Sequence, residues 1–134
     1  MIHILIVSHG NLGQALIEAA EMIVGPIEGL SAVALLPGET PEGFDVKLDA
    51  AFEAIAGEET LILIDLFGGT PYNVVARRVI KDHVECLTGA NLPMLLELVM
   101  ARDGASLPDL AQEIAQAGQE SVKNLGPMLK GGAL

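Results

Sequence analysis

The chain has 134 residues, the size of a single domain with its own hydrophobic core. Its formal net charge of −11 argues against a nucleic-acid partner, because binding phosphates requires a basic surface, and it favours a basic protein partner. Its one cysteine, Cys86, cannot form an internal disulfide, and its first residues lack the basic segment of a signal peptide, so we expect a cytoplasmic protein.

Apolar segments of strand length alternate with amphipathic segments of helix length, which is the pattern of βαβ units. The apolar segments predict strands near 2–7, 31–36, 60–66 and 83–88. The amphipathic segments predict helices near 11–23, 41–56, 71–81 and 92–102. Because the strands are apolar along nearly their whole length, we expect an α/β fold with a parallel sheet that is covered by helices on both faces.

A last helical pattern opens at Ser106, and its apolar periodicity continues to Leu125 with a weak point at Gly118. Because glycine often ends a helix, an earlier stop near Gly118 is also compatible with the pattern. The chain contains no internal repeat, low-complexity segment or interdomain linker. We therefore expect one domain over residues 1–134.

Two of the predicted strands run directly into a reactive side chain and then glycine. The first is followed by Ser8-His9-Gly10, and the third by Asp65 and the turn Leu66–Pro71. In a parallel α/β sheet the loops after the strands form the ligand face, and the binding crevice lies where the strand order reverses. If these are the first and third strands of a flavodoxin-type winding, His9 and Asp65 emerge side by side.

A histidine in this position can act as a nucleophile. Neutral imidazole attacks through one nitrogen when the other is held by a partner. Asp65 can accept the Nδ1–H of His9, which leaves Nε2 as the attacking atom, and its charge stabilises the cation that develops on attack. The pair therefore predicts a histidine that accepts a phosphoryl group.

The turn after Asp65 has the features of a phosphate-binding segment. Glycines let the backbone approach a ligand, a hydroxyl can donate a hydrogen bond, and the N-terminus of a helix attracts anions. The residues expected to bind phosphate are Phe67, Gly68, Gly69 and Thr70. The turn has neither the lysine of a Walker loop nor a GxGxxG pattern, so no nucleotide site is predicted.

Simpler structural roles for these residues remain open, whereas a serine–histidine triad and a metal site are not expected. Taken singly, His9 can be a surface histidine, Asp65 a loop cap and the glycines a plain tight turn. A Ser8–His9 pair cannot form a triad, because neighbouring residues of a strand point to opposite faces. The histidines and Cys86 lack the spacing of metal ligands, so we expect no metal site.

Three separate motifs carry a family resemblance: SHG at 8–10, DLFGGTPYN at 65–73 and GANLPMLLELVMAR at 89–102. They closely resemble the IIA domain of the mannose family of the bacterial phosphoenolpyruvate-dependent sugar phosphotransferase system, over essentially the whole chain. The resemblance implies that His9 carries the phosphoryl group, that Asp65 is its hydrogen-bond partner and that residues 67–70 hold the phosphate. Phe67 stands where the family often has tryptophan, and we expect it to preserve an apolar wall.

The resemblance also implies a particular fold and assembly. The expected fold is a doubly wound, mainly parallel sheet of order 2-1-3-4. A final antiparallel strand is expected to be exchanged between the subunits of a homodimer, which would make residues 120–126 a strand instead of the end of a helix.

The function implied by the resemblance is that of a phosphocarrier enzyme, a protein-histidine phosphotransferase that needs no cofactor. His9 would accept a phosphoryl group from the carrier protein HPr and pass it to a IIB protein that phosphorylates an incoming sugar. Contact with the membrane would be indirect, through a IIC/IID transporter. A regulatory IIA protein, in which phosphorylation of His9 switches a binding partner, would have the same site.

A receiver domain phosphorylated on Asp65 is a third possibility, because receivers carry an aspartate after the third strand. Receivers hold Mg²⁺ with an acidic pair after the first strand, where this chain has Ser8 and His9. They also need a lysine after a fifth strand, and none is placed for it. The sequence therefore favours His9 over Asp65 as the phosphorylated residue.

Overall fold

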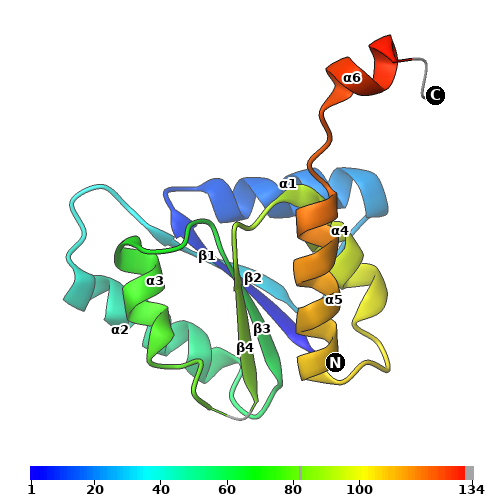
Figure 1. The fold of residues 1–134 in the computed structure, drawn as a ribbon. Coiled ribbons are helices and arrows are strands. Elements are labelled where there is room, and N and C mark those ends of the chain that lie inside the picture. Colours follow the sequence, from blue (N-terminus) through cyan, green and yellow to red (C-terminus); the bar gives the residue numbers. More distant parts are fainter. Residues whose placement is uncertain (82, 132–134) are drawn as a thin grey trace.

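A four-stranded parallel sheet of order β2-β1-β3-β4 forms the centre of the computed structural model, which describes residues 1–81 and 83–131 (Figure 1). The strands are β1 (His3–His9), β2 (Leu30–Leu35), β3 (Thr60–Ile64) and β4 (Val84–Thr88). The helices are α1 (Leu12–Val24), α2 (Pro41–Ala54), α3 (Gly69–Ala76), α4 (Leu92–Ala101), α5 (Leu107–Glu120) and α6 (Leu125–Lys130). The predicted α/β class, parallel pairing and order 2-1-3-4 are confirmed.

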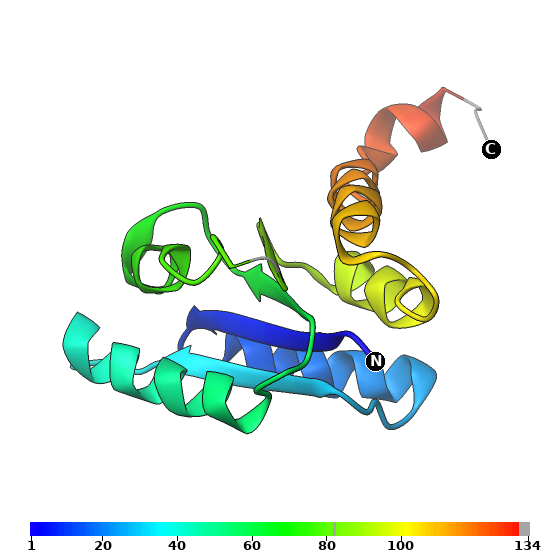
Figure 2. The same cartoon turned by 90° about the horizontal axis from the view of Figure 1, so that it is seen from below.

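Both faces of the sheet are buried, because successive residues of each strand point to opposite sides. Ile4 and Ile6 of β1 belong to a core shared with α1, α4 and α5, whereas Leu5 and Val7 pack with α2 and α3. All four side chains are fully buried. The helices α1 to α5 therefore form a layer on each side of the sheet (Figures 1 and 2), which explains why the central strands are apolar throughout.

Three of the helices begin at a polar residue that caps the first turn. The side chains of Thr40, Asn91 and Ser106 accept hydrogen bonds from the backbone N–H three residues later, at 3.0, 3.0 and 3.3 Å. Each cap is followed by proline at the first or second helical position, where a missing N–H leaves no bond unmade. No helix among the described residues is long and apolar enough to cross a membrane.

The C-terminal region differs from the prediction made from periodicity. The helix that was expected to reach Leu125 ends at Glu120, and Ser121 donates hydrogen bonds to the carbonyl of Gly118 from its N–H and its hydroxyl. Gly118 packs so closely on α4 that a Cβ there would lie 2.7 Å from the Met94 side chain. These tertiary and capping contacts fix the end of α5.

The seven residues that would form an exchanged strand are not a strand in the single chain. Glu120 is the last residue of α5, residues 122–124 have no regular secondary structure, and Leu125 opens α6. A strand forms only against another strand, and this segment pairs with none of the described ones. In Figure 1 the segment and α6 project away from the body of the fold.

His3 gives the fold a pH-dependent contribution to stability. Its side chain is 10% exposed, and its Nε2 lies 2.8 Å from the hydroxyl oxygen of Ser31. Burial lowers the pKa of His3 below its usual value. Two charged groups have smaller effects on this pKa: the Glu58 carboxylate raises it and Arg102 lowers it. Because the folded protein favours the neutral ring, this contribution is present above a pH of about 6.5, the ordinary pKa of histidine, and decreases as the pH falls below it.

Replacing His3 with glutamine should remove this part of the pH dependence, because an amide can keep the bond to Ser31 and does not titrate. The measurement is the free energy of unfolding in urea at pH 7.5 and at pH 5.5, for wild type and His3→Gln. We expect the wild type to lose more stability than the variant between the two pH values. Equal losses would show that another group accounts for the titration.

Candidate active site

The site lies at the carboxyl ends of the neighbouring strands β1 and β3. The Asp65 carboxylate oxygen Oδ2 is 2.9 Å from His9 Nδ1 and accepts a second hydrogen bond from the His9 backbone N–H at 3.0 Å. The His9 side chain is 48% exposed, whereas that of Asp65 is 10% exposed. The structure thus brings the two predicted residues together, with the histidine accessible and the carboxylate beneath it.

This geometry selects one form of the imidazole. An ionised carboxylate only accepts hydrogen bonds, so its contact with Nδ1 places the proton there and leaves the lone pair on Nε2. The other oxygen of Asp65, Oδ1, is buried and has no hydrogen-bond partner among the described residues. A buried carboxylate that is only partly satisfied interacts strongly with positive charge nearby. Asp65 is therefore placed to stabilise a cationic form of His9.

The glycine turn lies against the other side of the imidazole. A Cβ built on Gly69 would be 3.5 Å from Cε1 and 3.6 Å from Nε2 of His9. Gly68 and Gly69 have φ of 91° and 87°, in the left-handed region that side chains other than glycine rarely adopt. Nε2 therefore faces a stretch of backbone that carries no side chain.

The backbone amides of this turn are available to a ligand. In the part of the chain that the structure describes, no acceptor is found for the backbone N–H groups of Phe67, Gly68, Gly69 and Thr70. The helix α3 begins at Gly69, two residues before the predicted start, so the glycines themselves form its N-terminus. It ends at Ala76, short of the predicted residue 81, because the bond from Arg78 N–H to the Val75 carbonyl tightens the last turn.

Ser8 supports this arrangement from below, a role that the sequence analysis missed. Its hydroxyl accepts a hydrogen bond from the backbone N–H of Gly13 at 3.0 Å and donates one to the carbonyl of Gly10 at 3.2 Å. Ser8 is 1% exposed, and so lies on the opposite side of β1 from His9, as the alternation of a strand predicts. It fixes the turn between β1 and α1.

The loop after β2 follows the strand that pairs with β1, and an ion pair between Glu39 and Lys47 holds it. Glu39 accepts hydrogen bonds from the Leu36 backbone N–H at 2.6 Å and from Lys47 Nζ at 2.9 Å. The bond from Lys47, and then that from Leu36, holds the pKa of Glu39 below its usual value. Lys47 also donates to the Ala34 carbonyl at 2.6 Å, which ties α2 to the end of β2.

Exposed apolar side chains follow the strand ends on this face. Sequence reasoning gave a role only to Phe67 among them; Leu36 directly follows β2, and an apolar residue in that position is a signal that could have identified it. The group, which we call the apolar rim, comprises Leu12, Leu36, Leu66 and Phe67, with exposed fractions of 45%, 44%, 56% and 75%.

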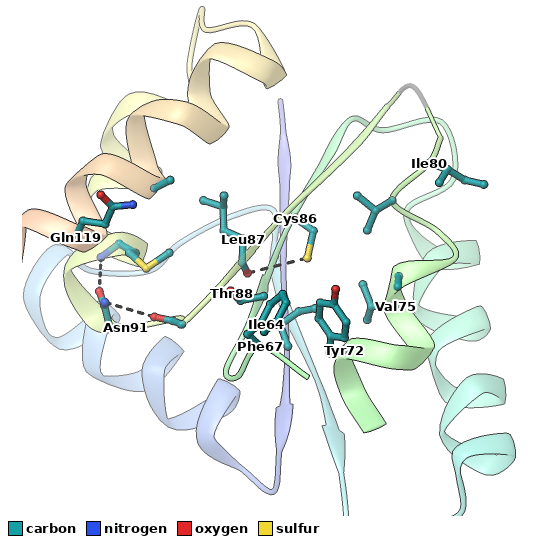
Figure 3. Close-up of a pocket in the computed structure, with 16 residues that line it drawn as sticks. Ile64, Phe67, Tyr72, Val75, Ile80, Cys86, Leu87, Thr88, Asn91 and Gln119 are labelled. Atoms are coloured by element: carbon teal, nitrogen blue, oxygen red, sulfur yellow. Dashed lines mark hydrogen bonds between the residues drawn. The ribbon is translucent and has the colours of Figure 1, made fainter. Parts of the chain in front are cut away.

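A groove of ≈ 750 Å³ begins beside the site and runs along β4 (Figure 3). Its lining includes Phe67 of the turn, Tyr72 of α3, Cys86 of β4 and Gly118 of α5. Among the described strands β4 pairs only with β3, so its other edge is open. Burial, and to a lesser extent Glu85, raises the pKa of the Cys86 thiol to about 12, so this side chain is a neutral part of an apolar surface.

Comparison with known proteins places these features in a family. The family model described as PTS system fructose IIA component matches residues 3–124. The fructose-specific EIIA component of Bacillus subtilis is 37% identical over 123 residues, which cover 90% of this chain and 84% of that protein. The mannose-specific EIIAB component of Escherichia coli K12 is 36% identical over 127 residues, covering 92% of this chain but only 39% of that longer protein.

Solved structures agree with this assignment. The phosphotransferase system component EIIA from Streptococcus agalactiae has a TM-score of 0.85 and 31% identity, over 93% of this chain and 98% of that one. The mannose/sorbose-specific IIA subunit from Enterococcus faecalis has a TM-score of 0.86 and 27% identity, over 92% and 93%. The chain therefore belongs to the mannose–fructose–sorbose family of IIA components of the sugar phosphotransferase system.

Proposed function

We propose that this protein is a phosphocarrier that accepts a phosphoryl group on Nε2 of His9 from phosphorylated HPr and transfers it to a histidine of a IIB protein. The observation that supports this most directly is the hydrogen bond of 2.9 Å between His9 Nδ1 and Asp65, which leaves Nε2 exposed toward the glycine turn. IIA components belong to a phosphotransferase system, and the assignment of His9 and Asp65 as its reacting pair is our inference.

The chemical step requires only protein side chains. The lone pair of His9 Nε2 attacks phosphorus, the P–N bond to the donor histidine breaks, and the donor imidazole leaves with the electron pair. The His9 ring becomes positively charged, while its Nδ1–H remains on Asp65. In this proposal the N–H groups of residues 67–70, for which no acceptor is found among the described residues, bind the phosphate oxygens together with the hydroxyl of Thr70, as the N-terminus of a helix does for other anions.

The surface around His9 suits transient docking of small proteins. The apolar rim offers contact area that excludes water from the reacting atoms, and the net charge of −11 attracts basic partners at a distance. We infer that HPr and the IIB protein use this same face in turn. The sugar would be taken up by IIC and IID membrane proteins, so this chain would meet the membrane only through them.

The test of this function is loading followed by discharge. The chain is incubated with phosphoenolpyruvate, enzyme I and HPr, separated from them, and mixed with a IIB protein of the same family. We expect about one phosphoryl group per chain, on His9, and its transfer to the IIB protein. Failure to load from phosphorylated HPr would contradict the proposal.

The glycine turn allows a matched pair of substitutions. Gly69→Val places branched methyl groups beside Nε2 of His9. The matched change is Gly68→Val: Gly68 has a similar positive φ, but a Cβ there would meet no atom within 4 Å apart from those of its chain neighbours. Both changes strain the backbone, and only the first obstructs the attacking nitrogen. We expect Gly69→Val to lower the rate of phosphoryl acceptance by about a hundredfold relative to Gly68→Val, as for other misplaced reacting groups. Equal rates in the two variants would show that the phosphate does not bind beside Gly69.

We propose in addition that the protein is a homodimer in which the segment 120–126 of each subunit adds an antiparallel strand to β4 of the other. The open edge of β4 and the apolar groove beside it supply the acceptor surface. The donor segment carries apolar side chains that are exposed in the single chain, with Val122 82% and Leu125 57% exposed. Pairing would bury both surfaces and satisfy the free edge of the strand.

Sedimentation equilibrium tests the dimer. We expect the wild type to sediment at about twice its chain mass of 14.0 kDa. Val122→Asp should shift it toward the monomer, since a buried charge opposes pairing. Met100→Asp is the control, because Met100 lies on α4, is 76% exposed and does not line the groove. A wild type that is monomeric at all concentrations would contradict the exchange.

A further inference from the structure

The turn that faces His9 is held by few contacts of its own. Two consecutive glycines with positive φ give its backbone wide conformational freedom, and the N–H groups of residues 67–70 bind no acceptor in the described part of the chain. Its one aromatic side chain, Phe67, is 75% exposed. A turn of this kind needs an external support if it is to present its amides to a ligand in a fixed geometry.

The ring of Tyr72 contacts the aromatic side chain of this turn. The ring centroids of Phe67 and Tyr72 are 4.9 Å apart with an interplanar angle of 57°, a tilted arrangement that aromatic pairs favour. Figure 3 shows the two rings close together, beside Ile64. Tyr72 itself packs on the buried core between the sheet and the helices α2 and α3. A chain of contacts thus leads from this core through Tyr72 and Phe67 to the glycines beside His9.

We propose that Tyr72 is a positioning residue for phosphoryl acceptance: its ring holds Phe67, and with it the turn 67–70, in place against Nε2 of His9. The inference rests on the proposed function of His9 and deepens it. Tyr72 acts through Phe67 and makes no contact with the reacting atoms itself. Because the interaction is between rings, phenylalanine at position 72 can replace tyrosine, and alanine cannot.

The first test compares rates of phosphoryl acceptance from phosphorylated HPr. Tyr72→Ala should be slower than wild type by about three- to tenfold, which corresponds to the loss of one aromatic pair. Tyr72→Phe should accept the phosphoryl group at the wild-type rate. Ile80→Ala is the control for a general effect of the groove, because Ile80 lines the same groove, is 86% exposed and is not part of the turn. Sedimentation of the wild type and the three variants checks that they share one oligomeric state.

The second test does not depend on phosphoryl transfer. Backbone ¹⁵N order parameters of residues 67–70 should fall in Tyr72→Ala from about 0.85, typical of rigid backbone, toward about 0.6, and should be unchanged in Tyr72→Phe and Ile80→Ala. Unchanged order parameters in Tyr72→Ala, or an equal loss of rate in Tyr72→Ala and Tyr72→Phe, would overturn the inference. If the wild type accepts no phosphoryl group, the proposed function fails, and the order parameters alone decide whether Tyr72 holds the turn.

Discussion

His9→Ala should abolish phosphoryl acceptance and leave the fold intact. The substitution removes the imidazole that is hydrogen-bonded to Asp65 in the structure, and the His9 side chain is half exposed and contributes little to the core. The hydrogen bond from the backbone N–H of residue 9 to Asp65 can survive in the variant, since it does not involve the side chain. The measurement is incorporation of labelled phosphate from phosphoenolpyruvate through enzyme I and HPr.

Circular dichroism and thermal unfolding of His9→Ala provide the control, and both should match the wild type closely. The chain has two other histidines, His3 and His83. Label that remains on the variant, at either of these positions, would show that the accepting residue is assigned incorrectly.

Asp65→Asn should reduce the rate of phosphoryl transfer by about a hundredfold or more, as neutralising the orienting acid does in other histidine-based sites. The amide can still accept a hydrogen bond from His9, but it lacks the negative charge that would stabilise the cation formed in the proposed attack. Rates of acceptance from phosphorylated HPr measure this effect. A variant that transfers at the wild-type rate would show that Asp65 has only a structural role.

The same substitution has a separate effect on stability. If the asparagine oxygen keeps both hydrogen bonds to His9, the NH₂ group of the amide takes the position of Oδ1 in Asp65. That position is buried and offers no hydrogen-bond partner among the described residues. An unsatisfied buried donor costs about 1–3 kcal/mol, so the free energy of unfolding of Asp65→Asn is needed to separate lost stability from lost catalysis. Thr70→Val is a milder comparison, because it removes one hydroxyl donor from the glycine turn. It should raise the activation free energy of phosphoryl transfer by about 1–2 kcal/mol.

The central part of the fold could be predicted because short stretches of sequence carry the signals that determine its strands and helix starts. Strands that are buried on both faces must be apolar throughout, and a prolyl first turn after a polar cap marks a helix start. The adjacency of His9 and Asp65 followed from the same logic, since both stand at carboxyl ends of strands that the winding makes neighbours. The structure confirms that adjacency, while the chemical roles of the two residues stay predictions.

What could not be predicted depends on how particular side chains pack and bond in the folded chain. The end of α5 is set by the packing of Gly118 on Met94 and by the hydrogen bonds of Ser121, and periodicity carries no information on either. The contact of Tyr72 with Phe67 is equally invisible in a sequence read as a helix with a preceding turn. Residues 120–126 illustrate the same limit, because the partner proposed for them is a second chain.

The most direct measurement of the central claim is the chemical identity and position of the phosphate. The full chain is phosphorylated with phosphoenolpyruvate, enzyme I and HPr, divided between acid and base, and mapped by mass spectrometry at alkaline pH. Phosphohistidine is lost in acid and survives base, whereas an acyl phosphate is lost in base. We predict an acid-labile, base-stable phosphate on the peptide that contains His9. A base-labile phosphate on the peptide that contains Asp65, or a stable one at another histidine, would contradict the account.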